Sequence, residues 1–309
     1  MFLSNKQKEI VLGIWGKKRY DEAIRCIDLY AEKWQLEKFE LIDKNARNLV
    51  LMCVSPKHGS CVLKIGFDGN FEKEIEVLRT FNGRGCCRLY EYSIEDKTHL
   101  IERILPGDDL EYGTTRDERG GFFCDLYKEL YSIPVKSTNS SIFPTVLSLL
   151  DDNKKGSLWR KDCEFISPHI ERARENILTA NAAYNTTLLH GDLNCCNILK
   201  NKNGKYTAID PIGLIGSPVF NIAEFIMGQW GNVLAAEPIE YLIDFIDLMS
   251  AQASVSAEIL KKCLYVETVV GLYGLEYKEG QYRSIGGSLK GYDYMVDNVL
   301  TAEKIMGDL

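Results

Sequence analysis

His-Gly-Asp-Leu-Asn-Cys-Cys-Asn fills residues 190–197, and Ile-Asp-Pro follows at residues 209–211. Phosphoryl transfer needs a carboxylate that orients and deprotonates the attacking hydroxyl, together with oxygen ligands that hold Mg²⁺ against the phosphates of a nucleotide. Asp192 can serve as the carboxylate, and Asn197 and Asp210 can serve as the metal ligands. We therefore predict a phosphotransfer site in this stretch.

The residues between Asn197 and Asp210 predict a β-hairpin. Residues 198–200 and 205–209 have the composition of strands, and Asn-Gly at 203–204 marks the turn between them. A hairpin brings its two ends together, so Asn197 and Asp210 can share one metal ion. Each short motif alone is more often an ordinary turn, cap or strand end, whereas the ordered combination favours a functional site.

Length and composition indicate a globular protein with two domains or lobes. The chain has 309 residues, of which 45% are hydrophobic, enough to bury a large core. Charged residues interrupt the segment from Met1 to Trp15, which therefore does not have the pattern of a signal peptide, and no apolar run approaches eighteen residues. We expect a cytoplasmic protein with no membrane contact.

Ten cysteines do not form the spacing of a metal site or a disulfide framework. Two pairs are adjacent, at 86–87 and 195–196, and the others are scattered without Cys-x-x-Cys spacing. We expect reduced thiols. Cys195 and Cys196 fall inside the predicted catalytic loop, where packing is the favoured role and redox sensitivity is the alternative.

Charge is unevenly distributed along the chain. Residues 1–104 carry 18 Lys and Arg against 16 Asp and Glu, a net charge of +2, and the remainder carries a net charge of −9. Nucleic acid is a poor partner for the acidic part, whereas a polycationic small molecule would be attracted to it. Acidic, solvated helices are the alternative explanation.

The first lobe combines a helix, an antiparallel sheet and a second helix. A helical pattern opens at Asp21, with apolar side chains on one face, and gives way to a strand-like segment at 39–42. Residues 48–54 and 60–65 predict strands around the turn at 55–59, and residues 70–81 predict a helix. The apolar residues of the first helical face are Ile24, Ile27, Ala31 and Trp34.

A strand lysine followed by a helix glutamate is the arrangement of a kinase small lobe. There the lysine holds the α- and β-phosphates and the glutamate orients the lysine. Lys64 and Glu74 are the predicted pair. Glu76 is the alternative partner, but its spacing points it away from the helix face that carries Leu78 and Phe81.

The lobes are expected to join at a hinge. Strands predicted at 88–93 and 98–103 lead into Ile-Leu-Pro-Gly at 104–107, where Pro-Gly breaks the regular pattern. We expect the carbonyl of Glu102 and the amide of Ile104 to recognise adenine. Residues 118–181 and 218–305 are mostly helical by periodicity. The prediction is an α+β, protein-kinase-like fold, with an antiparallel-sheet lobe over residues 1–104 and a mainly helical lobe over 105–309.

The ordered motifs resemble those of the aminoglycoside phosphotransferases, and most closely the branch of streptomycin 6-phosphotransferase and hydroxyurea kinase. The resemblance implies that Asp192 is the catalytic carboxylate, that Asn197 and Asp210 bind Mg²⁺, and that Lys64 binds the phosphates of ATP while paired with Glu74. It implies a supporting role for His190. The matching stretches are Trp34–Leu36, Val62–Lys64, Glu74 with Leu78, Gly83–Leu89, Leu100–Gly107, His190–Asn197 and Asp210–Pro218.

Several positions depart from the family pattern without touching the expected metal ligands. Asn221 stands where an aspartate usually begins the following helix, although asparagine can still cap it. The turn at 43–48, expected to cover the nucleotide, contains no glycine, so its main-chain amides would have to cradle the phosphates. The other departures are Asn194, Cys195, Ile212 and Ser217.

The leading functional hypothesis is an ATP- and Mg²⁺-dependent kinase that phosphorylates a hydroxyl of an aminoglycoside, with streptomycin as the first choice, and so confers resistance. Cationic groups on such an acceptor need carboxylates nearby, and the candidates are Glu237, Glu240, Asp244 and Glu267. One alternative is a kinase of a metabolite alcohol or sugar, which a substrate panel would distinguish. Another is a nucleotide-binding protein without transferase activity, which would be expected to have lost a site residue.

Overall fold

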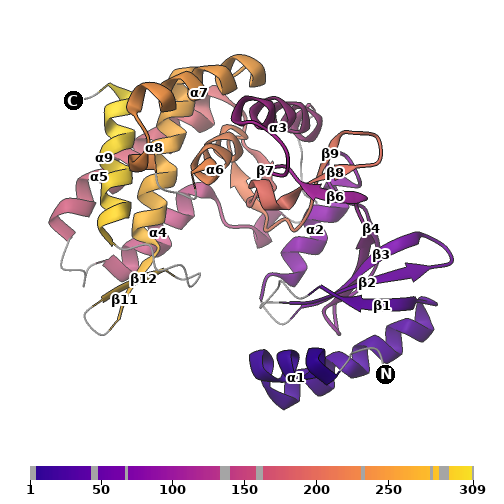
Figure 1. Ribbon diagram of the computed structural model, residues 1–309. Coiled ribbons are helices and arrows are strands. Elements are labelled where there is room, and N and C mark those ends of the chain that lie inside the picture. The colour runs from indigo at the N-terminus through magenta and orange to yellow at the C-terminus, as the bar shows by residue number, and fades with distance from the viewer. Residues whose placement is uncertain are drawn as a thin grey trace.

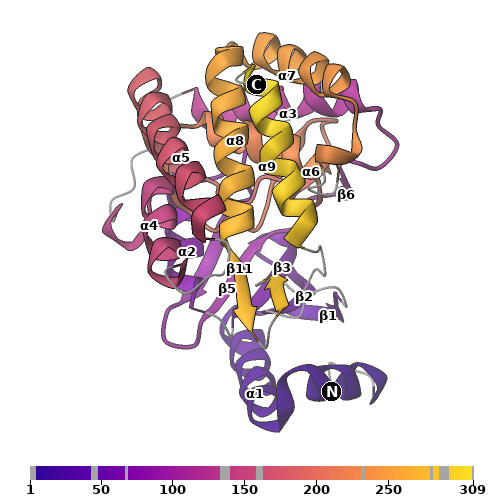
Figure 2. The same cartoon turned by 90° about the vertical axis from the view of Figure 1, so that its left-hand side faces the viewer.

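A computed structural model describes residues 5–42, 48–66, 69–132, 140–157, 163–230, 234–278, 281–284 and 292–307. Figure 1 shows a twisted sheet with a helix beneath it at one end of the molecule and a body of helices at the other. The perpendicular view in Figure 2 shows the same separation, with the two ends of the chain far apart. The predicted α+β organisation is therefore confirmed.

The first half of the chain forms a five-stranded antiparallel sheet in the order β1-β2-β3-β5-β4. Every second residue of β2 is buried, as expected for a strand with one face on the core. The strands are β1 (Glu37–Leu41), β2 (Asn48–Ser55), β3 (Gly59–Gly66), β4 (Leu89–Ser93) and β5 (Thr98–Glu102). The strands predicted at 48–54, 60–65, 88–93 and 98–103 agree with these bounds to within one residue.

Helix α1 (Asn5–Lys33) packs on one face of the sheet. The helix begins well before Asp21, where the sequence predicted its start, and it is interrupted at Gly16, whose φ of 74° and ψ of 170° are not helical. The apolar face that the sequence showed belongs to the part after this break, where Ile27 is fully buried against the sheet. The sequence analysis did not predict the earlier segment, although Val11 of this segment is also buried in the same cluster.

Helix α2 (Phe71–Phe81) lies between the sheet and the helical body and matches the predicted helix at 70–81. Its first turn contains Glu72 and Glu74, whose negative charges interact favourably with the positive end of the helix dipole. It ends at Asn82 in the left-handed conformation, a common C-terminal signal. Val77 and Leu78 belong to the same buried cluster as the helices of the second half.

The connection after β5 differs from the prediction, because Pro106 and Gly107, which were expected to break the regular pattern, begin a strand. Regular pairing ends at Glu102, but β6 (Pro106–Asp109) follows at once and pairs with β8 (Ile198–Asn201), which pairs with β9 (Tyr206–Ala208). The predicted hairpin at 198–209 is therefore confirmed. A proline is tolerated as the first residue of an edge strand, which explains why Pro106 does not prevent pairing.

The second half is mainly helical, as predicted, and β7 (Thr187–Leu189) and β10 (Leu214–Gly216) pair at its centre. One hairpin departs from the prediction: β11 (Leu275–Lys278) and β12 (Gln281–Ser284) interrupt the stretch at 218–305, because α8 ends at Gly274. The helices are α3 (Arg116–Tyr131), α4 (Val146–Ser157), α5 (Cys163–Ala183), α6 (Val219–Gln229), α7 (Ile239–Ala253), α8 (Ala257–Tyr273) and α9 (Tyr292–Met306), and the 3₁₀ turns are η1 (Ser140–Ile142), η2 (Cys195–Asn197) and η3 (Leu234–Ala236).

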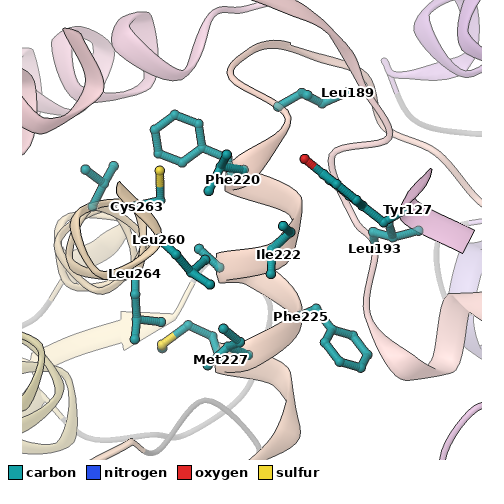
Figure 3. Close-up of a cluster of buried hydrophobic side chains, with 14 of the residues drawn as sticks. Tyr127, Leu189, Leu193, Phe220, Ile222, Phe225, Met227, Leu260, Cys263 and Leu264 are labelled. Carbon is teal, nitrogen blue, oxygen red and sulfur yellow. The ribbon is translucent and has the colours of Figure 1, made fainter. Parts of the chain in front are cut away.

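Helix α6 is the centre of this half because it is apolar on nearly all sides. Figure 3 shows Phe220 and Met227 on the side facing α8, whereas Phe225 points the other way. Phe225 stacks on Phe123 of α3, with ring centroids 3.9 Å apart. None of the helices in the described part of the chain is long and apolar enough to cross a membrane. The division at residues 104 and 105 stays a prediction.

Candidate active site

Lys64 and Glu74 form a buried ion pair. Strand β3 and the first turn of α2 place Lys64 Nζ 2.7 Å from Glu74 Oε1, and the two residues are only 4% and 8% exposed. Burial alone would raise the pKa of Glu74, but the nearby Lys64 ammonium and the contact with His99 outweigh it and hold that pKa at about 2. Burial would likewise lower the pKa of Lys64, yet Glu74 and Asp210 raise it. The pair is therefore charged at neutral pH.

Glu76, the alternative partner of Lys64, lies near Arg79 instead, with 3.6 Å between their charged atoms. The sequence reasoning missed His99. This residue lies on β5 directly opposite Lys64, is fully buried, and has its Nε2 3.3 Å from Glu74 Oε1. No sequence signal identified it, because the contact depends on the register between β3 and β5.

Asp192 lies in the loop after β7 and is restrained by two side-chain amides. Asn197 Nδ2 donates to Asp192 Oδ2 at 2.9 Å, and Asn194 Nδ2 donates to Asp192 Oδ1 at 2.7 Å. Asn194 also accepts a hydrogen bond from Cys196 N at the start of η2. Asn194, which the sequence showed only as a departure, thus contacts the predicted catalytic carboxylate directly.

Asp210 follows β9 and reaches the lysine of the other lobe. Its Oδ1 lies 3.3 Å from Lys64 Nζ, and its backbone is in the left-handed region with φ of 58°. The amide of Ile209 donates to the carbonyl of Asn197 at 2.9 Å, which closes the base of the hairpin. The structure therefore brings Asn197 and Asp210 to the same end of the hairpin, as expected from the sequence.

The donor set fits Mg²⁺. Asp210 provides a carboxylate. The side-chain nitrogen of Asn197 donates to Asp192, so the side-chain oxygen of Asn197 is the atom that can bind the metal. No three His, Cys, Asp or Glu side chains within the described ranges gather to hold a metal by themselves. Mg²⁺ does not require such a cage, since it commonly takes one or two protein oxygens and completes its shell with phosphates and water.

His190 is a structural residue of the loop. It is fully buried, and burial lowers its pKa to about 4, so the ring is neutral at physiological pH. Its Nδ1 accepts a hydrogen bond from the amide of Asp192 at 3.3 Å. Its carbonyl accepts from Ile212 and Gly213 at 2.9 and 3.0 Å, which ties the loop to the segment after Asp210.

Glu224 is a second residue that the sequence reasoning missed. It lies on α6, and its Oε2 accepts hydrogen bonds from the amide of Leu193 at 3.1 Å and from Asn221 Nδ2 at 2.9 Å. Burial, followed by the nearby Asp192, raises the pKa of Glu224 to about 7. Its spacing of three residues from Asn221 was visible in the sequence, but its contact with the loop was not.

A cavity of about 110 Å³ lies between the loop after β7 and helices α4, α6 and α8. Gly191, Asn221, Glu224 and Glu267 line it together with apolar side chains. Burial, followed by Glu224, raises the pKa of Glu267 to about 8. Of the four predicted acceptor residues, Glu267 thus lies beside the loop.

The other three candidates lie around the start of α7. Glu240 and Asp244 are exposed on that helix. Glu237 is half-buried, and its amide donates to the carbonyl of Leu234 in η3. None of the three is among the residues lining the cavity beside the loop.

The predicted hinge residues lie at the end of the sheet. Glu102 closes β5, and its amide donates to the carbonyl of Arg88 at 2.8 Å. Ile104 is buried. Both residues line a cleft of about 530 Å³ beside the turn between β8 and β9. Most of the predicted nucleotide-covering turn, residues 43–47, lies outside the described residues.

The cysteines of the loop differ in exposure. Cys195 accepts a hydrogen bond from Gln229 Nε2 at 3.2 Å, and burial raises its pKa to about 11, which disfavours the reactive thiolate at neutral pH. Cys196 is exposed. The nine cysteines with described side chains are all free thiols, as expected.

Comparisons with known proteins identify the family of this chain. The pattern of a protein family described as "Aminoglycoside/hydroxyurea antibiotic resistance kinase" matches residues 33–272, which is most of the chain. "Streptomycin 6-kinase" from Streptomyces glaucescens is 24% identical over 209 residues, covering 66% of this chain and 66% of that protein. The match spans just under two thirds of that relative's length.

Two solved structures show the fold. Choline kinase LicA from Streptococcus pneumoniae gives a TM-score of 0.61 at 12% identity, with 94% of this chain and 100% of that chain covered. The "streptomycin-ATP-APH(2")-IIa ternary complex" gives 0.57 at 15% identity, with 91% and 98% covered. The predicted protein-kinase-like, two-lobe fold is confirmed by these similarities.

Proposed function

Because the chain belongs to the aminoglycoside/hydroxyurea antibiotic resistance kinase family, we propose that it is an ATP- and Mg²⁺-dependent phosphotransferase that phosphorylates a hydroxyl of an aminoglycoside. Streptomycin is the first candidate, and such an activity would confer resistance to it. One observation carries the proposal, which is the contact between the two lobes at Asp210. Lys64, paired with Glu74, has its Nζ 3.3 Å from Asp210 Oδ1. Asp210 follows one strand of the hairpin, and Asn197, which precedes the other strand, donates a hydrogen bond to Asp192.

The nucleotide would lie between the two lobes. Lys64 is a fixed positive charge because Glu74 holds it and burial restricts its movement, so it can bind the α- and β-phosphates of ATP. The carbonyl of Glu102 and the amide of Ile104 are the proposed contacts of the adenine ring at the hinge. Lys64 gives up part of its contact with Asp210 when phosphate oxygens approach.

Asp192 would orient the acceptor hydroxyl and take its proton. The amides of Asn194 and Asn197 hold the carboxylate in one orientation, so that its geometry is set before the acceptor binds. The deprotonated oxygen attacks the γ-phosphorus in line with the leaving oxygen of ADP. Asn197 and Asp210 would hold Mg²⁺, which compensates the charge of the phosphates.

The acceptor is proposed to be cationic. Glu267 and Glu224 line the cavity beside Gly191, next to the loop that carries Asp192. A guanidinium or ammonium group of the acceptor would stabilise these carboxylates in their charged form. Glu237, Glu240 and Asp244 remain proposed contacts for more distant cationic groups, because none of the three is buried.

Mass spectrometry of acceptors incubated with the purified protein, ATP and Mg²⁺ tests this function. We expect the mass of streptomycin or another aminoglycoside to increase by one phosphoryl group, and a sensitive bacterium expressing the protein to grow on that compound. A phosphorylated neutral alcohol, with no phosphorylated aminoglycoside, would instead support a kinase of a metabolite alcohol or sugar.

A further inference from the structure

Two backbone amides on either side of Asp192 are held by side chains from distant helices. The amide of His190 donates to the hydroxyl of Tyr131, at the end of α3, at 3.1 Å. The amide of Leu193 donates to Glu224 Oε2 of α6 at 3.1 Å. Figure 3 shows Leu193 beside α6, next to Tyr127 from α3. The orientation of the loop therefore depends on both helices.

Asn221 joins these two anchors. Its Oδ1 accepts a hydrogen bond from the Tyr131 hydroxyl, and its Nδ2 donates to Glu224 Oε2 at 2.9 Å. Asn221 is 2% exposed, so its amide must find its partners within the protein. The hydrogen bonds form a continuous relay from His190 through Tyr131, Asn221 and Glu224 to Leu193.

The relay requires an amide at position 221. An aspartate could accept from Tyr131, but it has no N–H to donate to Glu224. It would also place a second carboxylate one helical turn from Glu224, whose pKa is already raised to about 7 by burial and by Asp192. The helix begins at Val219 with Pro218 as its N-cap, so Asn221 does not cap it as expected from the sequence, and its side chain instead bonds Tyr131 and Glu224.

We propose that Tyr131, Asn221 and Glu224 are positioning residues that hold the catalytic loop on both sides of Asp192, and that asparagine at 221 is required because Glu224 is the anchor of Leu193. The proposal rests on the proposed phosphotransfer function for its effect on turnover. Its effect on the protection of the two amides is independent of that function. Neither Asn221 nor Glu224 has to touch the reacting atoms for this role.

The relay is tested by exchanging the amide and the carboxylate between positions 221 and 224. Asn221→Asp should lower kcat on the order of 10- to 100-fold, because Asp192 is displaced from its productive position, while the KM for ATP changes less than about twofold. Adding Glu224→Gln should restore most of kcat at saturating acceptor, whereas the KM for a cationic acceptor should rise because Glu224 also lines the proposed acceptor cavity. In the double variant, the new glutamine can donate to the new aspartate through its nitrogen and accept from the amide of Leu193 through its oxygen.

Hydrogen exchange at the amides of His190 and Leu193 provides a readout that needs no acceptor. Hydrogen exchange at both amides should accelerate in Asn221→Asp and return toward the wild-type rate in the double variant. Tyr131→Phe should accelerate hydrogen exchange at the amide of His190. Met227→Leu, a buried change of similar volume on α6, should alter neither exchange nor kcat.

Two results would overturn the relay: unchanged exchange at both amides in Asn221→Asp, or a double variant no better than that single variant in kcat and exchange. If no acceptor is phosphorylated by the wild-type protein, the proposed function fails. Accelerated exchange in Asn221→Asp and its reversal in the double variant would still support the relay in that case.

Discussion

Asp192 and Lys64 lie in different lobes and are restrained by different means. Asp192 is held by neutral amides, from Asn194 and Asn197, which fix its direction without neutralising its charge. Lys64 is held by the carboxylate of Glu74, which keeps its ammonium group charged despite burial. The first arrangement suits a group that receives a proton, and the second suits a permanent phosphate ligand.

Replacing Asp192 with alanine should abolish most transfer and leave ATP binding nearly unchanged. The carboxylate faces the acceptor in the proposed mechanism, and the loss of general acid–base help typically costs about 10²- to 10⁴-fold in rate. Steady-state kinetics gives kcat, and calorimetry gives the affinity for ATP. A variant with wild-type turnover would disprove the role assigned to this residue.

Asp210→Asn and Asn197→Ala should weaken nucleotide binding in the presence of Mg²⁺ more than in its absence. Asn197→Ala removes an oxygen ligand, and Asp210→Asn removes the negative charge of the other ligand, so Mg²⁺ is held less tightly and the phosphate charge is less well compensated. Titration calorimetry with ATP, with and without Mg²⁺, measures the difference. Asp109→Asn, on strand β6 and outside the proposed metal site, is the matched control. An unchanged metal dependence in both test variants would argue against a metal site at the base of the hairpin.

At the scale of elements, the hairpin of β8 and β9 and the helices α6 and α8 have complementary roles. The hairpin brings Asn197 and Asp210 together by local chain geometry. Helices α6 and α8 bring Glu224 and Glu267 to one cavity through packing of residues far apart in the sequence. The two carboxylates lie close enough for Glu224 to raise the pKa of Glu267.

The raised pKa of Glu267 predicts a pH-dependent effect on stability. The folded protein retains this proton up to about pH 8, whereas the unfolded chain releases it near pH 4. The folded state therefore binds more protons across this window, and the free energy of unfolding falls as pH rises through it. Glutamine cannot ionise, so Glu267→Gln should remove this decrease in the free energy of unfolding.

Thermal unfolding measures this effect. We expect Glu267→Gln and the wild type to have similar Tm values near pH 5, and the variant to unfold roughly 2–6 °C higher near pH 9. Glu175→Gln, at an exposed position on α5, should show no such divergence. Parallel pH profiles for Glu267→Gln and the wild type would show that Glu267 does not carry a raised pKa.

At the scale of the whole molecule, the charges are divided between the two halves of the chain. The part before residue 105 is nearly neutral, and the part after it carries a net charge of −9. A cationic acceptor would therefore be attracted toward the lobe that holds Asp192, Glu224 and Glu267. The anionic nucleotide would instead depend on local positive groups such as Lys64.

The affinity for a cationic acceptor should consequently fall as ionic strength rises. Raising the salt concentration from about 0.01 to 0.15 M shortens the Debye length from about 30 to 8 Å and screens the acidic surface. The KM for streptomycin should increase severalfold over this range. A neutral acceptor, such as a sugar or hydroxyurea, should show little change. A streptomycin KM independent of salt would mean that the acidic lobe is a solvated surface without a role in binding.

The sequence by itself determined the order of the main elements and placed the candidate residues Asn197 and Asp210 on one hairpin. The strands at 48–54 and 60–65, the helix at 70–81 and the hairpin at 198–209 follow from periodicity and turn chemistry, which depend on neighbouring residues. Asn197 and Asp210 converge because a hairpin joins its own ends. These features were predictable because each depends on short-range geometry.

The tertiary structure alone decided which distant side chains meet. His99 reaches Glu74 through the register of β3 and β5, and Glu224 reaches Leu193 because α6 packs against the loop after β7. A lone histidine or glutamate carries no local sequence signal of such a contact. Tertiary packing also changes the chemistry of a side chain: burial, followed by Glu224 of another helix, raises the pKa of Glu267.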